Sequence, residues 1–243
     1  MNILLTNDDG IHAPGLLALY RKFRPNHEVS VAAPEVEQSA VGHAITLADP
    51  IRVKEIHNDG EFFGYSVNGT PADCVKLALA ELLKTRPDVV ISGINLGANV
   101  GINLLYSGTV SAATEAAILN LPALAVSLDT FTNPDFSYAA EFTRRLVEKL
   151  PEMNIPRRVS LNINIPSVSR SRITKVAWVR QGQTVAGENF IRRKDPRGNV
   201  YYWQGQEVLP PDLEEDTDIN LLRNGMITHY DELSRLEKYP LTP

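Results

Sequence analysis

Residues 3–10 have the sequence ILLTNDDG, in which a short apolar run is followed directly by polar and turn-forming residues. This order predicts a buried strand that ends in a turn. A helix is predicted next, because Pro14 suits a first helical position, apolar side chains repeat at helical spacing up to Phe23, and Pro25 ends the pattern. The start of the chain therefore predicts a strand–turn–helix unit.

The same alternation of strand and helix recurs over roughly the first 150 residues of the chain. Strands are predicted at 29–33, 89–91 and 123–128, and helices at 75–83, 111–120 and 136–150. Because each crossover helix must pack back on the sheet, this order predicts a doubly wound α/β fold with a mostly parallel sheet. Ligands bind beyond the carboxyl ends of the strands in such folds, so the residues that follow each strand are the candidates for function.

The pattern changes in the last third of the chain. Residues 159–165 alternate apolar and polar side chains, and further strand-like runs occupy 173–180 and 201–203. The sequence Asp-Pro-Arg-Gly at 195–198 indicates a turn between two strands. We expect antiparallel strands here, including a hairpin arm that either pairs with another subunit or folds back on its own domain.

Length and composition narrow the class of protein. The chain of 243 residues suits one domain, which we divide into a core over 1–155 and, over 156–243, C-terminal strands, an oligomerisation hairpin and a closing element. Its single cysteine, Cys74, excludes a disulfide framework within the chain and a cysteine-based zinc cluster. The net charge of −5 disfavours binding to a nucleic-acid polymer. Neither a membrane helix of ~20 apolar residues nor a signal-peptide pattern occurs, so we expect a cytoplasmic protein without a membrane partner.

Two adjacent carboxylates, Asp8 and Asp9, follow the first predicted strand. In the turn beyond a strand both side chains can point toward one place, where they repel each other unless a cation lies between them. Carboxylate oxygens suit Mg²⁺ or Mn²⁺. Taken alone, an Asp-Asp-Gly turn is more often simply solvated, so this motif leaves both interpretations open.

The loop after the second predicted strand contains Ser39 and His43. Ser39 can complete the oxygen shell of a cation only if the loop curls over the end of the first strand. His43 has the chemistry of a general base, although we favour a hydrogen-bonded structural histidine. Thr70, before the helix that contains Cys74, is explained as a helix cap.

Two later turns carry small, hydroxyl and amide side chains. Glycines in 92–101 allow close backbone approach, and Asn95 offers a neutral amide oxygen, which leaves attraction for a dianionic phosphate undiminished. Ser107, Gly108 and Thr109 open directly into an alanine-rich helix. Free N–H groups and hydroxyls at the positive end of a helix predict an anion-binding turn, whereas an ordinary cap explains one hydroxyl but not the whole run.

Several segments occur in this order along the chain: ILLTNDDGIHAPG, QSAVGHAITL, VNGTPADCVKLAL, PDVVISGINLGANVG, YSGTVSAATEAA and RKDPRGNVYYW. Together they resemble the SurE family of stationary-phase survival proteins, which are metal-dependent 5′/3′-nucleotidases. The resemblance runs from residue 1 to about 205. It implies a Rossmann-like core, an extended C-terminal arm, and homodimers or homotetramers.

The resemblance also implies roles for particular residues. Asp8, Asp9, Ser39 and Asn95 correspond to the ligands of one divalent cation (Mg²⁺, Mn²⁺ or also Co²⁺), and Ser107, Gly108 and Thr109 to the phosphate-binding turn. The chain departs from the family at Ser111, where glycine is common, and over 225–233, which keep only an outline of the usual ending.

The expected function is hydrolysis of nucleoside 5′- and 3′-monophosphates to nucleoside and phosphate, with short polyphosphate as a further substrate class. We expect Asp8 and Asp9 to be catalytic, with Asp9 orienting the attacking water, and Asn95 to contact the phosphate as well as the cation. Base preference, 5′ against 3′ preference and the physiological cation stay open at this stage.

Three other functions are alternatives to this one. A phospho-aspartate enzyme needs Asp-x-Asp, and position 10 is glycine. A receiver-like signalling domain needs an aspartate at the end of a middle strand, where this chain has Ser92 and Gly93. A nucleotide-binding regulatory protein with little catalysis is the remaining alternative.

Overall fold

The computed structural model describes residues 1–153, 155–185, 189–205, 210, 212 and 214–231 of the chain. The helices and strands are β1 (Asn2–Thr6), α1 (Pro14–Phe23), β2 (Glu28–Pro34), β3 (Val53–Asn58), β4 (Glu61–Val67), α2 (Pro71–Leu77), β5 (Val89–Leu96), α3 (Gly108–Ile118), β6 (Ala123–Asp129), α4 (Ser137–Lys149), β7 (Ser160–Pro166), β8 (Val176–Trp178), β9 (Phe190–Lys194), β10 (Val200–Gln204), α5 (Asp218–Arg223) and β11 (Ile227–Asp231). A π-helical turn (Ala78–Leu82) extends α2, and a 3-10 turn (Gly101–Tyr106) precedes α3. None of the helices in the described ranges has the length and apolar character of a membrane span.

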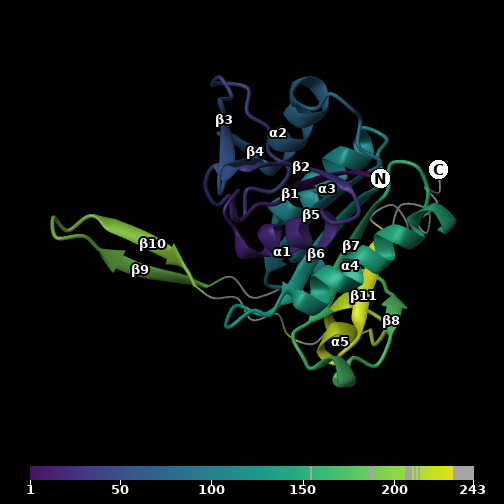
Figure 1. The fold of residues 1–243 in the computed structure, drawn as a ribbon. Coiled ribbons are helices and arrows are strands. Elements are labelled where there is room, and N and C mark those ends of the chain that lie inside the picture. Colours follow the sequence, from purple (N-terminus) through teal and green to yellow (C-terminus); the bar gives the residue numbers. More distant parts are fainter. Residues whose placement is uncertain (154, 186–188, 206–209, 211, 213, 232–243) are drawn as a thin grey trace, which may run out of the picture.

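Within these residues, nine strands form one sheet in the order β3-β4-β2-β1-β5-β6-β7-β11-β8 (Figure 1). Strand β1 lies parallel to β2 on one side and to β5 on the other. The sheet continues in parallel from β2 to β4, and from β5 through β6 to β7. The chain therefore winds first to one side of β1 and then to the other, which confirms the doubly wound α/β fold. This reversal places the carboxyl ends of β1 and β5 side by side, where such folds bind ligands.

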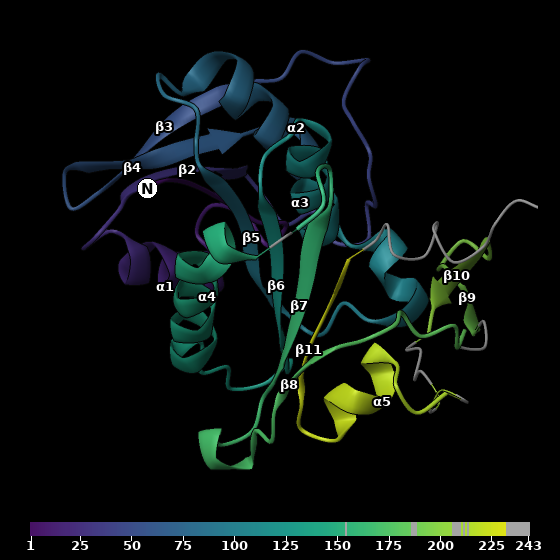
Figure 2. The ribbon, with the colours of Figure 1, turned by 90° about the vertical axis from the view of Figure 1, so that its right-hand side faces the viewer.

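Helices cover both faces of the sheet. Figure 2 shows α1 and α4 on one face and α2 and α3 on the other. The core beneath α1 and α4 is built from large side chains such as Leu16, Leu19 and Phe23, whereas α3 contributes small ones such as Ala112 and Ala116. The two faces thus have separate apolar cores, and small side chains let α3 lie close to the sheet.

Two helices begin earlier than the apolar periodicity predicts. Helix α2 begins at Pro71 rather than residue 75, because Thr70 and Asp73 form a capping box in which each side chain accepts a hydrogen bond from the other residue's backbone N–H. This confirms Thr70 as a cap. Helix α3 begins at Gly108 rather than residue 111, with Ser107 as its N-cap.

Strand β7 differs from the antiparallel segment predicted at 159–165. It pairs in parallel with β6 and antiparallel with β11, so it belongs to the main sheet, which continues beyond residue 155. Every residue of β7 is buried, including Asn162 and Asn164. The alternation of apolar and polar residues therefore reflects two buried faces of different chemistry, and not one core face and one solvent face.

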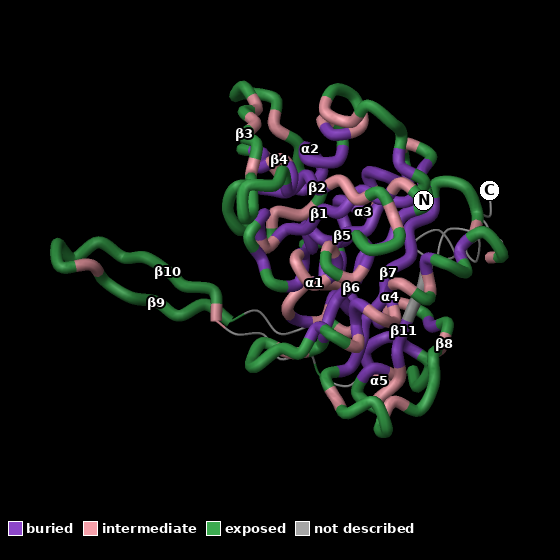
Figure 3. Tube along the Cα trace, viewed as in Figure 1, coloured by how far each residue is buried: buried purple, intermediate pink, exposed green. Residues whose placement is uncertain are grey.

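The strands β9 and β10 form the predicted hairpin, which projects from the body as an arm (Figure 1). At its turn, the carboxylate of Asp195 accepts hydrogen bonds from the backbone N–H groups of Arg197 and Asn199, each at 2.8 Å. Every residue of both strands is exposed, as the green arm in Figure 3 shows. This exposure excludes the alternative in which the hairpin folds back on its own domain.

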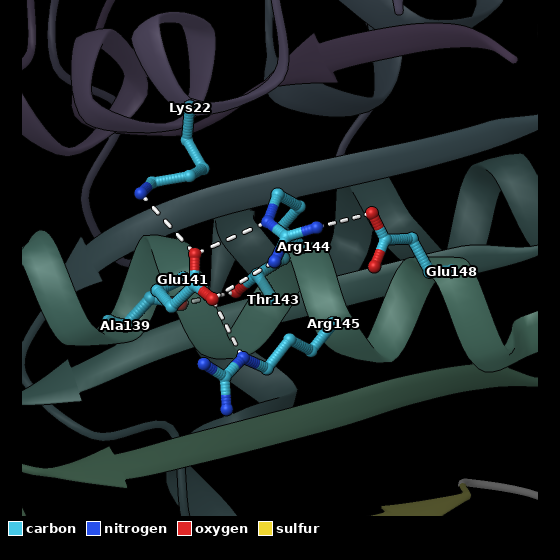
Figure 4. Close-up of polar contacts among 7 residues, drawn as sticks. All are labelled: Lys22, Ala139, Glu141, Thr143, Arg144, Arg145 and Glu148. Carbon is cyan, nitrogen blue, oxygen red and sulfur yellow. Dashed lines mark hydrogen bonds and ion pairs between the residues drawn. The ribbon is translucent and has the colours of Figure 1, made fainter. Parts of the chain in front are cut away.

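An ion-pair network joins α1 to α4 at the surface (Figure 4). Glu141 accepts hydrogen bonds from Arg144 and Arg145 on its own helix and from Lys22 of α1, whose Nζ lies 3.4 Å from Glu141 Oε2. The bonds from Arg144 and Arg145 lower the pKa of Glu141 to about 2. The side chains of the network are partly exposed to solvent, so these ion pairs add little to the free energy of unfolding.

Candidate functional site

The residues predicted to bind a cation and a phosphate gather at the carboxyl ends of β1 and β5. Asp8 is buried and Asp9 half-buried in the turn after β1. Asn7 closes this turn by donating from Nδ2 to the carbonyl oxygen of Gly10 at 2.9 Å, and Gly10 adopts a φ of +101° that favours glycine. The sharp turn brings both carboxylates out of the strand and above its end.

The side chain of Asp8 lies against the start of α3. The Thr109 hydroxyl and its backbone N–H both donate to the Asp8 carboxylate. A Cβ atom at Gly108 would lie only 2.7 Å from Asp8 Cβ, so this approach requires glycine at position 108. The predicted phosphate-binding turn and the first predicted cation ligand are therefore in direct contact.

The side chain of Asp9 points toward the end of β5, where it accepts a hydrogen bond from the backbone N–H of Leu96. The neighbouring Asn95 donates from Nδ2 to the carbonyl oxygen of Gly97 at 2.8 Å. Because this bond engages the amide nitrogen, it orients the side chain so that Oδ1 is the end left to act as a ligand.

The two aspartates are held in an environment that disfavours their negative charge. Burial raises the pKa of Asp8, although the hydrogen bonds from Thr109 oppose this effect. Burial, together with the nearby charges of Asp8 and Glu37, raises the pKa of Asp9 to about 7. A cation bound between the carboxylates would remove this cost.

The remaining donor atoms agree with such a cation. Asp8, Asp9, Ser39 and Asn95 supply oxygen atoms, which are the ligands of hard divalent ions. In the described part of the chain, buried side-chain oxygens of Thr6, Asn7 and Ser92 have no hydrogen-bond partner; Thr6 and Asn7 lie at the end of β1, and Ser92 pairs with Thr6 from within β5. The residues present therefore fit a hard divalent cation.

The loop after β2 curls over the end of β1, as the prediction for Ser39 requires. The backbone N–H of Gln38 donates to the carbonyl oxygen of Asp8 at 2.8 Å, which places Ser39 next to the aspartate turn. The hydroxyl of exposed Ser39 donates to Glu37. The sequence prediction missed Glu37, although its acidic neighbour Glu35 and its place after a strand were available signals.

Two contacts tie the Ser39 loop to the helical segments beneath it. The backbone N–H of Gly42 donates to the carbonyl oxygen of Tyr106 at 3.0 Å, directly before the predicted anion-binding turn. His43 Nε2 lies 2.8 Å from Oε2 of Glu115, a buried residue of α3 that also pairs with Lys76 at 3.3 Å. His43 is therefore hydrogen-bonded, as we expect from the sequence.

A buried polar network supports the segment that follows β5. Asn99 accepts hydrogen bonds at its carbonyl oxygen from Asn162 Nδ2 at 2.8 Å and Asn164 Nδ2 at 3.0 Å, and its N–H donates to Asn164 Oδ1 at 2.8 Å. The buried carboxylate of Asp218 accepts from Gly101 N–H at 2.9 Å. The sequence prediction missed these supporting residues; the polar positions of 159–165 were the available signal.

Comparison with known proteins agrees with this geometry. The model of the family "Survival protein SurE" matches residues 3–188. The chain is 49% identical to the 5'-nucleotidase SurE of Syntrophobacter fumaroxidans over 99% of this chain and 100% of that protein, and 41% identical to that of Petrotoga mobilis over 98% and 99%. Its fold is similar to the crystal structure of the SurE protein from Aquifex aeolicus, with a TM-score of 0.82 and 37% identity over 95% of this chain and 92% of that one.

Proposed function

The chain belongs to the SurE family of survival proteins, and on that premise we propose that it is a metal-dependent nucleotidase that hydrolyses nucleoside 5′- and 3′-monophosphates to nucleoside and phosphate. The observation that carries the proposal is the contact between the aspartate turn and the start of α3. One end of the sheet thus combines carboxylates suited to a cation with a helix N-terminus suited to an anion.

Asp8, Asp9, Ser39 and Asn95 are the residues that would hold one divalent cation, Mg²⁺, Mn²⁺ or Co²⁺. When bound, such a cation supplies a Lewis acid that neutralises phosphate oxygens and makes water a better nucleophile. Asn95 adds an oxygen without adding negative charge, which keeps the site attractive to a dianionic phosphate.

Ser107, Gly108 and Thr109 would receive the phosphate at the positive end of α3. Ser107 holds the helix start in place, because its Oγ accepts a hydrogen bond from the backbone N–H of Val110 at 3.2 Å. Gly108 keeps the approach beside Asp8 free of a side chain. The positive end of a helix stabilises the negative charge that develops on phosphate oxygens during an in-line displacement.

Asp9 orients the attacking water in this proposal and accepts its proton. Its side chain points toward the end of β5, next to the proposed ligand Asn95, so it lies at the place where that water would be held. Asp8, by contrast, is engaged by the donors of Thr109 and is the better-positioned cation ligand.

We further propose a homodimer or homotetramer that forms through the β9–β10 arm. Large side chains on the arm are strongly exposed, with Tyr202 at 61% and Trp203 at 63% of their full accessible area. A two-stranded hairpin is marginally stable alone, so pairing with a second copy would stabilise it.

A cytoplasmic location is proposed from the single, buried thiol of Cys74, which suits a reducing compartment.

The test is phosphate release from adenosine 5′-monophosphate, adenosine 3′-monophosphate and tripolyphosphate, each with Mn²⁺, Mg²⁺ or Co²⁺ and with chelator. Cation-dependent release from the two monophosphates is expected. Nucleotide binding without release in any of these cations would instead favour the regulatory alternative.

A further inference from the structure

Phe131 is an exposed aromatic residue beside the proposed active site. It lies in the loop after β6 and keeps 81% of its full accessible area. Single exposed apolar side chains are common on soluble proteins, so exposure alone assigns no role. The position and orientation of this ring are more informative.

The ring of Phe131 touches the backbone of Gly97 with its far edge. A Cβ atom built on Gly97 would lie 2.4 Å from Cζ and 2.5 Å from Cε1 of the ring. Because the residue keeps 81% of its accessible area, this contact covers only a small part of the ring and leaves flat aromatic surface open to a ligand. The ring therefore offers an open surface to a ligand and is not buried in a cavity.

The same glycine connects the ring to the cation-binding residues. The carbonyl oxygen of Gly97 accepts the hydrogen bond from Asn95 Nδ2 at 2.8 Å, and its N–H donates to the carbonyl oxygen of Leu128 at 2.9 Å. Phe131 thus lies against the residue that orients the proposed ligand Asn95.

The turn that carries Phe131 is braced by hydrogen bonds on both sides of the ring. The N–H of Thr130 donates to the carbonyl oxygen of Leu128 at 2.7 Å. Thr130 Oγ1 donates to the carbonyl oxygen of Thr132 at 2.9 Å and accepts from its N–H at 3.2 Å. An ordered turn lowers the entropy that a ligand must overcome when it binds the ring.

We propose that Phe131 is the platform on which the base of the nucleoside monophosphate stacks. This inference rests on the proposed nucleotidase function and adds the recognition of the nucleoside half of the substrate. A nucleoside monophosphate has an anionic end and a flat aromatic end, and the site offers an anion-binding turn and an open aromatic face to match. Stacking tolerates every base but favours the larger purines, because it scales with the overlapping π surface.

The test compares a substrate that has a base with one that lacks it, adenosine 5′-monophosphate and ribose 5-phosphate, in Mn²⁺. Phe131→Ala should raise KM for adenosine 5′-monophosphate about tenfold and leave kcat nearly unchanged, because stacking is the same in the ground and transition states. The kinetic constants for ribose 5-phosphate should not change. The preference for adenosine over uridine 5′-monophosphate should shrink in the same variant.

Matched variants distinguish an effect of the aromatic face from an effect of side-chain size. Phe131→Tyr keeps a ring and should behave as wild type, whereas Phe131→Leu keeps an apolar side chain and should resemble Phe131→Ala. Ile118→Ala removes another exposed apolar side chain, 50% exposed at the far end of α3, and should leave the kinetic constants for both substrates unchanged.

Tyr106, 58% exposed beside the anion-binding turn, is the rival platform. A selective rise in KM with Tyr106→Ala and none with Phe131→Ala overturns the proposal.

Other outcomes are equally decisive. An equal loss on both substrates, or a changed molecular mass of Phe131→Ala in light scattering, overturns the stacking role while the nucleotidase function stands. A wild-type protein that releases phosphate from neither ester overturns the proposed function, and the stacking role with it.

Discussion

Asp8 and Asp9 are the residues on which the proposed chemistry depends, and their burial makes a cation and a proton compete for the same place. Burial raises the pKa of both carboxyl groups, for Asp9 to about 7. Without a cation the folded protein therefore binds a proton here more tightly than the unfolded chain does. Its stability falls as the pH rises from about 4 through 7, and a bound cation should reverse this loss.

The first prediction follows from this competition. The affinity for Mn²⁺ should weaken about tenfold per unit as the pH falls below about 7, and should level off above it, because the cation must displace the proton on Asp9. Isothermal titration calorimetry at several pH values, at constant ionic strength, measures this dependence. An affinity that is constant from pH 6 to pH 8 would contradict it.

Thr109 is the second residue whose role can be isolated. Thr109→Val keeps the shape of this buried side chain but removes the hydroxyl that donates to Asp8. A hydrogen bond to a charged group contributes ~1.5–3 kcal/mol, so kcat/KM should fall about tenfold or more, and its acidic limb should move to higher pH. Thr109→Ser, which keeps the hydroxyl, is the control. A pH profile of Thr109→Val that superimposes on wild type would argue against this role.

At the scale of elements, the loop after β2 and helix α3 act together. Glu115 is buried on α3 and holds His43 of that loop, while Ser39 lies four residues earlier. Glu115→Gln should loosen the loop and lower the affinity for Mn²⁺, because the ligand Ser39 is then less well held. Calorimetry measures this change, and Lys76→Met, which removes the more exposed partner of Glu115, should have a smaller effect. Wild-type affinity in Glu115→Gln would show that the loop needs no such support.

The hairpin arm provides a separate test of assembly. Replacing Tyr202 and Trp203 with serine removes two large exposed side chains, so it should lower the oligomeric mass while the melting temperature of the dissociated subunit changes little. Light scattering after size-exclusion chromatography measures the mass. Ile118→Ala, on the body of the molecule, is the control. An unchanged mass in the double variant would locate the subunit contact elsewhere.

Across the whole molecule, elements determined by neighbouring residues could be predicted from local sequence, whereas the way that β7 pairs in the sheet could not. The aspartate turn, the strand before it and the helix after it are determined by neighbouring residues, so their pattern is visible in 3–25. Strand β7 pairs instead with β6 and with the distant β11, and its Asn162 and Asn164 donate from Nδ2 to the carbonyl oxygen of Asn99, more than 60 positions away. The polar positions in 159–165 are visible in the sequence, but the distant partners of these side chains are not.

The same distinction applies to the candidate site. Carboxylates that follow a strand are visible in the sequence, whereas the contact between Asp8 and Thr109 joins residues 101 positions apart. Glu37 and Asp218 were missed for the same reason, because their effects on the site depend on how the loop after β2 and helix α5 pack. The candidate residues of the site can be named from the sequence, whereas the contacts between them depend on the fold.

The most direct measurement of the central claim is Mn²⁺-dependent phosphate release from adenosine 5′-monophosphate by Asp8→Asn and Asp129→Asn. Asp129 ends the strand β6 at the same edge of the sheet but is not one of the proposed ligands, so it is a matched control. We expect Asp8→Asn to lose at least about a hundredfold in kcat/KM and Asp129→Asn to remain within a few-fold of wild type. Cation-dependent release at the wild-type rate by Asp8→Asn would contradict the account.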